Sequence, residues 1–178
     1  MYKGNVLITG VSTGIGYYCA QYFIKEGYRV LGSVRKEADA RKCKTELGAA
    51  FHPLTFDVTN EEQILKGYEE TKSILGREGL VLLVNNAGIS VAGPTSLLEK
   101  SDYQRQFDVN LFGMFSVTKI FLPLLGATEN SEVPPGKIFN ISSVAGQLVY
   151  PFMGPYSASK FAVEGFSHAL RRELLLYG

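Results

Sequence analysis

Cysteine and histidine are scarce in this chain of 178 residues, which has two of each. Cys19 and Cys43 lack the spacing of a disulfide framework, so we expect both to be reduced and near packing surfaces. No group of His, Cys, Asp and Glu has the spacing of metal ligands, which argues against a metal centre. Reduced cysteines indicate a reducing setting, and we expect the protein to be cytoplasmic.

Runs of one charge and long apolar runs are also lacking. Eighteen Lys and Arg balance 17 Asp and Glu, and no basic run supplies phosphate contacts for a nucleic acid. No uninterrupted apolar run approaches the ~20 residues of a membrane span. We expect no signal peptide, because the start MYKG leads directly into NVLITG. The composition predicts one globular domain over residues 1–178.

The chain does contain a regular alternation of short apolar runs and longer helix-like stretches. The predicted strands are Asn5–Thr9, Arg29–Val34, Phe51–Phe56, Leu80–Val84 and Lys137–Ser142. The predicted helices are Gly14–Glu26, Glu37–Leu47, Glu61–Leu75, Asp102–Leu125 and a last one beginning near Tyr156. Gly27 and Gly48 are predicted to end the first two helices and Ser101 to cap the fourth. This alternation predicts an α/β fold with a doubly wound parallel sheet.

Three glycines follow the first predicted strand in the stretch TGVSTGIG. Gly10, Gly14 and Gly16 depart from the G-x-G-x-x-G spacing, but glycines here still allow a sharp turn and a close approach to a pyrophosphate. The start of the next helix favours anionic groups. A glycine-rich turn can also be purely structural, but its position at the first strand–helix turn favours a dinucleotide cofactor.

The residue that reads the cofactor ribose is expected about 20 residues further on, after the second strand. There the chain reads SVRKE. Val34 stands where an acidic residue would bind the 2′-hydroxyl, and Arg35 follows, well placed to meet a 2′-phosphate. The alternative for Arg35 is a solvated loop charge. We predict NADP as the preferred cofactor and NAD as the second choice.

A second candidate site lies in the stretch GPYSASKFAVEGF. Tyr156 and Lys160 are four residues apart, on one face of the predicted last helix. Tyr68 and Lys72 have the same spacing, so spacing alone does not separate a catalytic pair from two neighbours on a solvated face. A free tyrosine has a pKa near ~10, and a nearby ammonium can favour the phenolate, which would suit the phenol to proton transfer.

Six motifs in order decide between these readings, because they make the whole chain resemble the short-chain dehydrogenase/reductase family. They are TGVSTGIG at 9–16, FDVTN at 56–60, NNAG at 85–88, VNLFG at 109–113, ISSVAG at 141–146 and YSASK at 156–160. The stretch SKFAVEGFSHALRREL is similar to the retinol- and hydroxysteroid-dehydrogenase branch. The resemblance implies a Rossmann-like fold and NAD(P)(H)-dependent interconversion of a secondary alcohol and a carbonyl.

The resemblance also implies residue roles. Tyr156 is the acid/base, Lys160 its partner and Ser143 the anchor of the carbonyl or alkoxide oxygen. Ser143 is preferred to Ser142 because it lies 13 residues before Tyr156, the family's usual spacing. Asn110 completes a tetrad and supports a water-linked proton path near the lysine. The expected cofactor contacts are Gly10, Ser12, Thr13, Gly14, Ile15, Gly16, Arg35, Asp57, Val58, Asn86, Ala87, Gly88, Tyr156 and Lys160.

Two further expectations concern the substrate and the oligomer. Val149, Phe152 and Met153 follow the fifth strand and either form an apolar wall over the nicotinamide or merely pack the loop. The first option favours a hydrophobic alcohol or ketone, such as a steroid- or retinoid-like one. The resemblance implies a homodimer or homotetramer formed by the fourth and last helices. Their apolar faces contain Phe112, Phe115, Ile120, Phe161, Phe166 and Leu170.

Family members usually continue past the Tyr/Lys helix with two further strands and a substrate-covering segment. We therefore expect the fold to lack those C-terminal strands, and the 178 residues to be part of a longer enzyme or a natural short form. The second option leaves an alternative function, a non-catalytic nucleotide-binding or dimerisation module. The intact set of Ser143, Tyr156 and Lys160 favours the enzyme.

Overall fold

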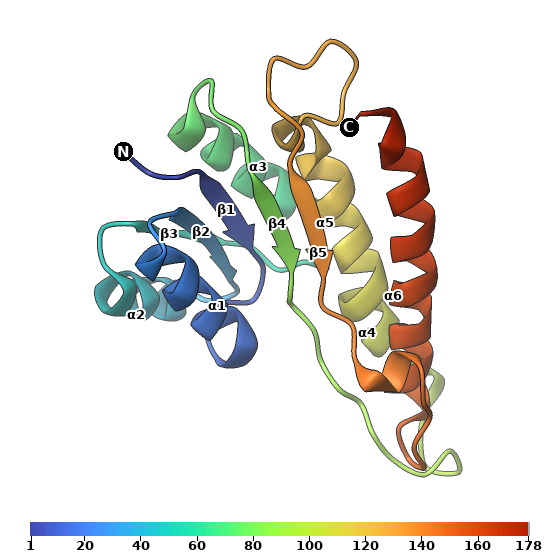
Figure 1. The fold of residues 1–178 in the computed structure, drawn as a ribbon. Helices are drawn as coiled ribbons and strands as arrows, with labels where there is room; N and C mark the ends of the chain where they lie inside the picture. The colour runs from blue at the N-terminus through green and yellow to red at the C-terminus, as the bar shows by residue number, and fades with distance from the viewer. Residues whose placement is uncertain (178) are drawn as a thin grey trace.

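The computed structural model describes residues 1–177, which form a parallel sheet with helices on both faces (Figure 1). The strands are β1 (Asn5–Ile8), β2 (Arg29–Val34), β3 (Phe51–Thr55), β4 (Leu82–Asn85) and β5 (Lys137–Asn140). Their order in the sheet is β3-β2-β1-β4-β5, and every neighbouring pair is parallel. The chain first builds outward from β1 to β3 and then crosses to β4 on the other side. The carboxyl ends of β1 and β4 therefore flank the switch point at which such sheets bind ligands.

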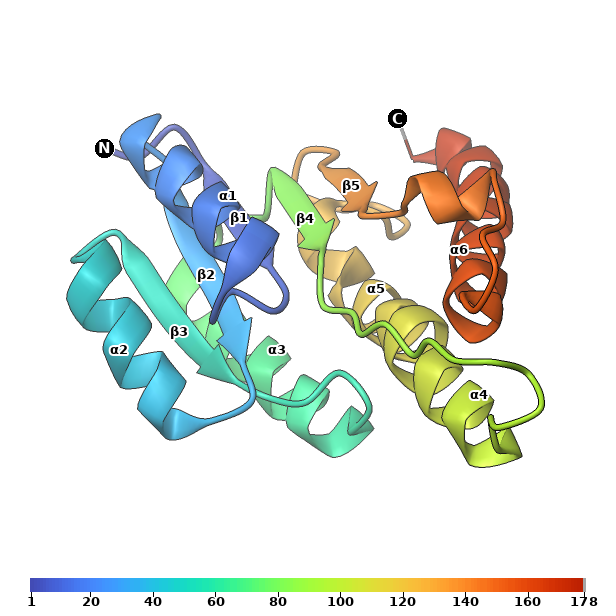
Figure 2. The same cartoon turned by 90° about the horizontal axis from the view of Figure 1, so that it is seen from below.

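The helices cover the sheet in two layers, as the views in Figures 1 and 2 show. They are α1 (Gly14–Lys25), α2 (Glu37–Leu47), α3 (Glu61–Leu75), α4 (Lys100–Phe107), α5 (Met114–Phe121) and α6 (Gly154–Glu173). Val6 and Ile8 of β1 pack in one core cluster with residues of α1 and α2, whereas Leu7 packs in the other with residues of α3 and α5. Burial on both faces explains why β1, β2 and β4 appear as continuous apolar runs.

The predicted fourth helix is one continuous helix over Lys100–Leu125, in which α4 and α5 are joined by a π-helical turn, η1 (Asp108–Gly113). By length and composition this helix could cross a membrane, because an 18-residue stretch of it reaches a mean hydropathy of 1.3, although it contains no uninterrupted apolar run of that length. Its Val117 and Phe121 are nevertheless fully buried in the core cluster with α3. The helix is thus a core element of this fold.

Two predicted helix starts differ from the structure. The fourth helix begins at Lys100, and a capping box of Glu99 and Asp102 stands where Ser101 was predicted to cap. The Ser101 prediction is wrong because Asp102 Oδ2 accepts from the Glu99 N–H at 3.1 Å, and this pair satisfies the helix start. The last helix begins at Gly154 rather than Tyr156, with proline in its first turn.

The strand β5 forms an edge of the sheet in residues 1–177, as expected from the sequence. Its Phe139 is 52% exposed. A groove of about 670 Å³ lies between β5 and the second half of α6, and Leu170 and Leu174 help to line it. The apolar surface beside the fifth strand is therefore open within the described residues.

Candidate active site

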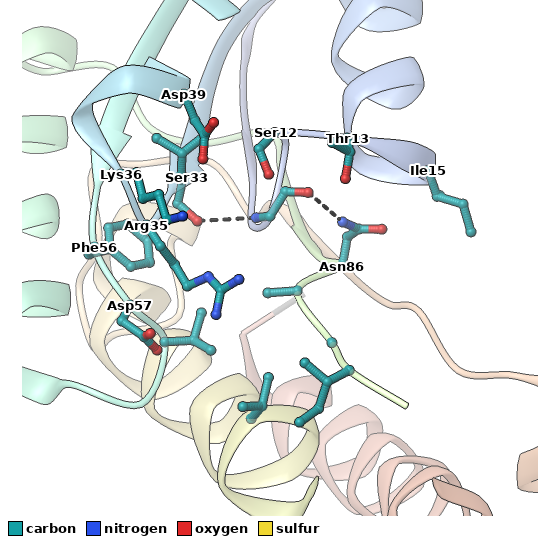
Figure 3. A pocket seen from close by; sticks show the side chains of 17 residues that line it. Ser12, Thr13, Ile15, Ser33, Arg35, Lys36, Asp39, Phe56, Asp57 and Asn86 are labelled. Carbon is teal, nitrogen blue, oxygen red and sulfur yellow. Dashed lines mark hydrogen bonds between the residues drawn. The ribbon is translucent and has the colours of Figure 1, made fainter. Parts of the chain in front are cut away.

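A cleft of about 380 Å³ opens at the switch point of the sheet (Figure 3). It is lined by Gly10, Ser12, Thr13, Ile15, Ser33, Val34, Arg35, Lys36, Asp39, Phe56, Asp57, Val58, Asn86, Ala87, Gly88, Ile89 and Val109. Most of the predicted cofactor contacts are in this set. Gly14, Gly16, Tyr156 and Lys160 are the predicted contacts that do not line it.

The glycines shape the turn between β1 and α1. Gly10 and Gly14 have φ values of +71° and +61°, in the left-handed region that favours glycine. A Cβ at Gly16 would collide with the Asn86 amide and the Gly10 carbonyl oxygen, so glycine lets the start of α1 lie against the loop after β4. Gly14 and Gly16 thus support the cleft without lining it.

The start of α1 is suited to an anion. Within residues 1–177, no side chain caps this helix, whose N-cap is Thr13. Its first backbone N–H groups therefore remain available, and the helix dipole adds positive potential beside the cleft. Together with the close approach that Gly10 permits, this arrangement fits a pyrophosphate group.

The Asn-Asn-Ala-Gly segment is fixed to the end of β1. Thr9 Oγ1 accepts from the backbone N–H groups of Asn86 and Ala87, both at 3.0 Å. The Asn86 amide donates to Thr9 O at 2.9 Å and Gly10 O at 3.0 Å. These bonds join two loops 77 residues apart in sequence and form a firm wall of the cleft.

The segment after β2 brings charge to the cleft. The guanidinium of Arg35 extends into it on the side of Asp57 (Figure 3). Val34, immediately before, is buried and apolar, so this position offers no carboxylate to a ribose hydroxyl. Lys36 also lines the cleft and adds a second positive charge, while Asp39 opposes it. Asp57 lines the cleft as well, so the two positive and two negative charges cancel in number, and a phosphate is favoured locally by the Arg35 guanidinium that extends into the cleft.

Several lining residues were missed from the sequence. Ser33, Lys36 and Asp39 flank Arg35 on the same segment, so the rule that pointed to Arg35 could have included them. The backbone N–H of Gly10 donates to Ser33 Oγ at 3.2 Å, which joins the glycine turn to β2. Ile89 and Val109 come from other elements, and only the fold brings them to the cleft.

Ser143 lies in the segment after β5, and Tyr156 and Lys160 lie in α6. Ser143 caps the short 3-10 turn η3 (Val144–Gly146), and its Oγ accepts from Ala145 N at 3.1 Å, which leaves its O–H as a donor. Lys160 Nζ donates to Ile141 O at 2.7 Å and lies 5.7 Å from the ring centroid of Tyr156. Within residues 1–177, no hydrogen bond joins the Tyr156 phenol to Ser143 or Lys160.

The ammonium of Lys160 is held in a buried setting. The residue is only 7% exposed, and burial lowers the pKa of its amine, while the Glu164 carboxylate one turn later raises it to a smaller extent. The bond to Ile141 O offsets part of the cost of burying the charge. The amine is therefore fixed beside Tyr156.

Asn110 lies in the π-helical turn η1, and π turns are frequent at functional sites. Its Oδ1 accepts from Ile89 N at 2.8 Å, and its Nδ2 donates to Ile89 O at 3.0 Å and Ser159 Oγ at 3.1 Å. Its amide therefore connects the cleft wall to the helix of Tyr156 and Lys160. The water-linked proton path stays a prediction.

The loop before α6 exposes apolar side chains. Val149 and Phe152 are 65% and 63% exposed, which argues against the option that they only pack the loop. Phe152 has a φ of +66°, uncommon for a bulky residue, and its carbonyl accepts from Gly93 N at 2.7 Å. This bond ties the loops that follow β4 and β5 together at the carboxyl edge.

Comparison with known proteins gives consistent results. The family model described as short chain dehydrogenase matches residues 4–178. The chain is 42% identical over 172 residues to an NADPH-dependent 3-dehydrocapnine reductase of Ornithobacterium rhinotracheale, covering 97% of this chain and 60% of that protein. It is 38% identical over 174 residues to mouse (Mus musculus) retinol dehydrogenase 16, covering 97% of this chain and 53% of that protein.

A solved structure agrees with the fold. The F189W actinorhodin polyketide ketoreductase with NADPH superposes with a TM-score of 0.90 at 34% identity, over 100% of this chain and 69% of that one. The chain thus spans between about half and three-fifths of the length of the two curated relatives named above.

Proposed function

This chain belongs to the short-chain dehydrogenase/reductase family, and from that premise we propose that it is an NADP(H)-dependent oxidoreductase that interconverts a secondary alcohol and a carbonyl. The observation that carries the proposal is the hydrogen-bonded connection between the cleft and the Tyr/Lys helix. Ile89 of the cleft wall is bonded to Asn110, and Asn110 to Ser159 of the same helix turn as Lys160. A dinucleotide in the cleft would thus lie next to a proton donor.

The cleft residues fit NADP(H). The glycine turn and the start of α1 would hold the pyrophosphate, Asp57 and Val58 the adenine, and Arg35 with Lys36 the 2′-phosphate. The similar 3-dehydrocapnine reductase is NADPH-dependent and the ketoreductase structure contains NADPH, which supports the same choice. When bound, the nicotinamide supplies or accepts a hydride at the substrate carbon.

The side chains beside the cleft would handle the proton and the oxygen charge. The Tyr156 hydroxyl donates its proton to the carbonyl oxygen during reduction and takes it back from the alcohol during oxidation. The Lys160 ammonium, fixed by Ile141 O, stabilises the negative charge that Tyr156 carries after donation. The free O–H of Ser143 donates to the same substrate oxygen, as in an oxyanion hole.

The exposed apolar loop supports a hydrophobic substrate. Val149 and Phe152 lie within a few residues of Ser143 and Tyr156 in sequence, and their exposed side chains offer apolar contact area at the carboxyl edge. The similarity to a retinol dehydrogenase points in the same direction. We propose a steroid- or retinoid-like or other hydrophobic alcohol or ketone as substrate.

We also propose a homodimer formed through α4–α5 and α6. Phe112, Phe115 and Phe161 are 56%, 44% and 45% exposed on these two helices, and Phe115 packs edge-to-face with Phe166 at 6.0 Å. Exposed aromatic side chains on neighbouring helices are typical of a protein interface.

The test combines binding and turnover. NADPH fluorescence titration measures cofactor binding, and the loss of NADPH absorbance with a panel of hydrophobic ketones measures reduction. We expect both signals from the parent chain and binding alone from Tyr156→Phe. Tight NADPH binding with no turnover on any ketone would instead favour the alternative, a non-catalytic nucleotide-binding module.

A further inference from the structure

Two serines on α6 have matching hydrogen bonds. Ser159 Oγ accepts from Asn110 Nδ2 at 3.1 Å and donates to Tyr156 O at 2.7 Å. Ser167 Oγ accepts from Asn140 Nδ2 at 2.9 Å and donates to Val163 O at 2.7 Å. Each serine thus docks the helix on an asparagine of a neighbouring element and bonds a carbonyl about one turn back.

The two serines differ in what they connect. Asn140 belongs to β5 and is bonded in turn to Asn85 of β4, at 2.8 Å, so Ser167 holds the helix to the sheet. Asn110 is hydrogen-bonded to Ile89, which lines the cleft. Because Ser159 is bonded to Asn110, it holds the helix to the cleft wall. Only the Ser159 bonds end on the backbone of Tyr156.

The direction of these bonds is fixed. The hydroxyl hydrogen of Ser159 points to Tyr156 O, so its lone pair faces the Asn110 amide. Asn110 is oriented by Ile89, which uses both its N–H and its C=O. Ser159 is 0% exposed and Asn110 3%, so the bond between these two side chains is shielded from water, while Ile89 and Tyr156 at the two ends are half-buried. The result is a hydrogen-bonded connection from Ile89 through the buried side chains of Asn110 and Ser159 to the backbone of Tyr156.

We propose that Ser159 is a positioning residue, which sets the Tyr156 phenol and the Lys160 amine in register with the cofactor cleft. This inference rests on the proposed function for its kinetic consequences. The connection itself, from Ile89 to Tyr156, is a property of the folded chain. Because an error of about 1 Å in a reacting group can cost on the order of a hundredfold in rate, a single buried hydroxyl at this turn has a large effect on turnover.

The experiment compares Ser159→Ala with Ser167→Ala. Both substitutions remove one hydroxyl from the same helix, with one asparagine donor and one carbonyl acceptor in each case, and they differ in burial because Ser159 is fully buried and Ser167 is half-buried. We therefore expect both variants to lose thermal stability, and Ser159→Ala to lose more, because water can replace the lost hydroxyl more easily at the half-buried Ser167. Ser159→Cys is the second variant, since a thiol fills nearly the same space but is a weak hydrogen-bond donor.

Two measurements test whether Ser159 connects Tyr156 to the cleft. The first is amide hydrogen exchange at Ile89, whose N–H is bonded to Asn110. Ser159→Ala should accelerate this exchange about 2- to 10-fold, as expected for the loss of one buried hydrogen bond, and Ser167→Ala should leave it unchanged. The second is steady-state kinetics with NADPH and a ketone, in which Ser159→Ala and Ser159→Cys should lower kcat about 10-fold or more with little change in KM for NADPH. Ser167→Ala should have the kcat and the KM for NADPH of the parent chain.

The outcomes separate this inference from the proposed function. A parent chain without turnover refutes the proposed oxidoreductase, but the exchange rate at Ile89 still decides whether Ser159 connects Tyr156 to the cleft. Unchanged exchange in Ser159→Ala overturns the connection. Equal kinetic losses in Ser159→Ala and Ser167→Ala overturn the positioning role, because the effect would then belong to helix docking in general.

Discussion

Replacing Arg35 with alanine should weaken NADPH binding selectively. A hydrogen bond to a charged group contributes about 1.5–3 kcal/mol, and the lower end applies because Arg35 is exposed and its charge is screened by solvent. About 1.4 kcal/mol corresponds to a tenfold change in Kd. Lys36 remains at the cleft and keeps part of the attraction for a 2′-phosphate. We therefore expect the Kd for NADPH to rise roughly 10-fold, whereas the Kd for NADH, which lacks the phosphate, stays within about twofold.

The assay is a fluorescence titration of both cofactors at fixed ionic strength. Arg41→Ala is the matched control, because Arg41 is an exposed arginine on the adjacent helix α2 that does not line the cleft. Raising the salt concentration should narrow the difference between parent and Arg35→Ala with NADPH. Equal losses with NADPH and NADH, or the same loss in Arg41→Ala, would refute the assignment of Arg35 to the 2′-phosphate.

Three other predictions concern the catalytic pair and the dimer. Tyr156→Phe should bind NADPH with parent affinity but lose nearly all ketone reduction, by roughly a hundredfold or more in kcat; substantial residual turnover would reject Tyr156 as the acid/base. Burial lowers the pKa of Lys160 below its ordinary 10.5, so the unfolded chain keeps this proton to higher pH than the folded chain. The stability of the parent relative to Lys160→Met should therefore rise as pH increases toward 10.5, as measured by urea denaturation at several pH values; a constant difference would contradict this. Phe161→Glu should shift sedimentation from dimer to monomer at micromolar concentration, and an unchanged sedimentation coefficient would exclude this face from the interface.

The order of the elements followed from the sequence because a doubly wound sheet leaves strong local signals. The strands β1, β2 and β4 are buried on both faces, as Val6 and Leu7 are on opposite sides of β1, so each appears as an apolar run between helical stretches. The glycine turn was readable for a similar reason. Gly10 and Gly14 have positive φ values that favour glycine. Such a requirement determines the residue type at its own position, so it is visible in the sequence.

Helix boundaries were less readable, because side chains compete to satisfy the same backbone groups. Ser101 is a good N-cap by type, yet Glu99 and Asp102 form the cap together and extend the helix. The π-helical turn around Asn110 also left no sequence signal, since it continues the apolar pattern of the helix on either side.

The sequence by itself therefore determined the fold class and the glycine turn, because these depend on residue type and local spacing. The residues proposed for chemistry were identified by the resemblance of six ordered motifs to the family, because Tyr68 and Lys72 have the same spacing as Tyr156 and Lys160. The tertiary structure alone decided which distant residues meet. It joined Thr9 to the Asn86 loop, brought Ile89 to the cleft, and connected Asn110 to Ser159 across 49 residues. The physical reason is that buried polar groups must find partners wherever the folded chain brings them, and those partners are set by packing rather than by proximity in sequence.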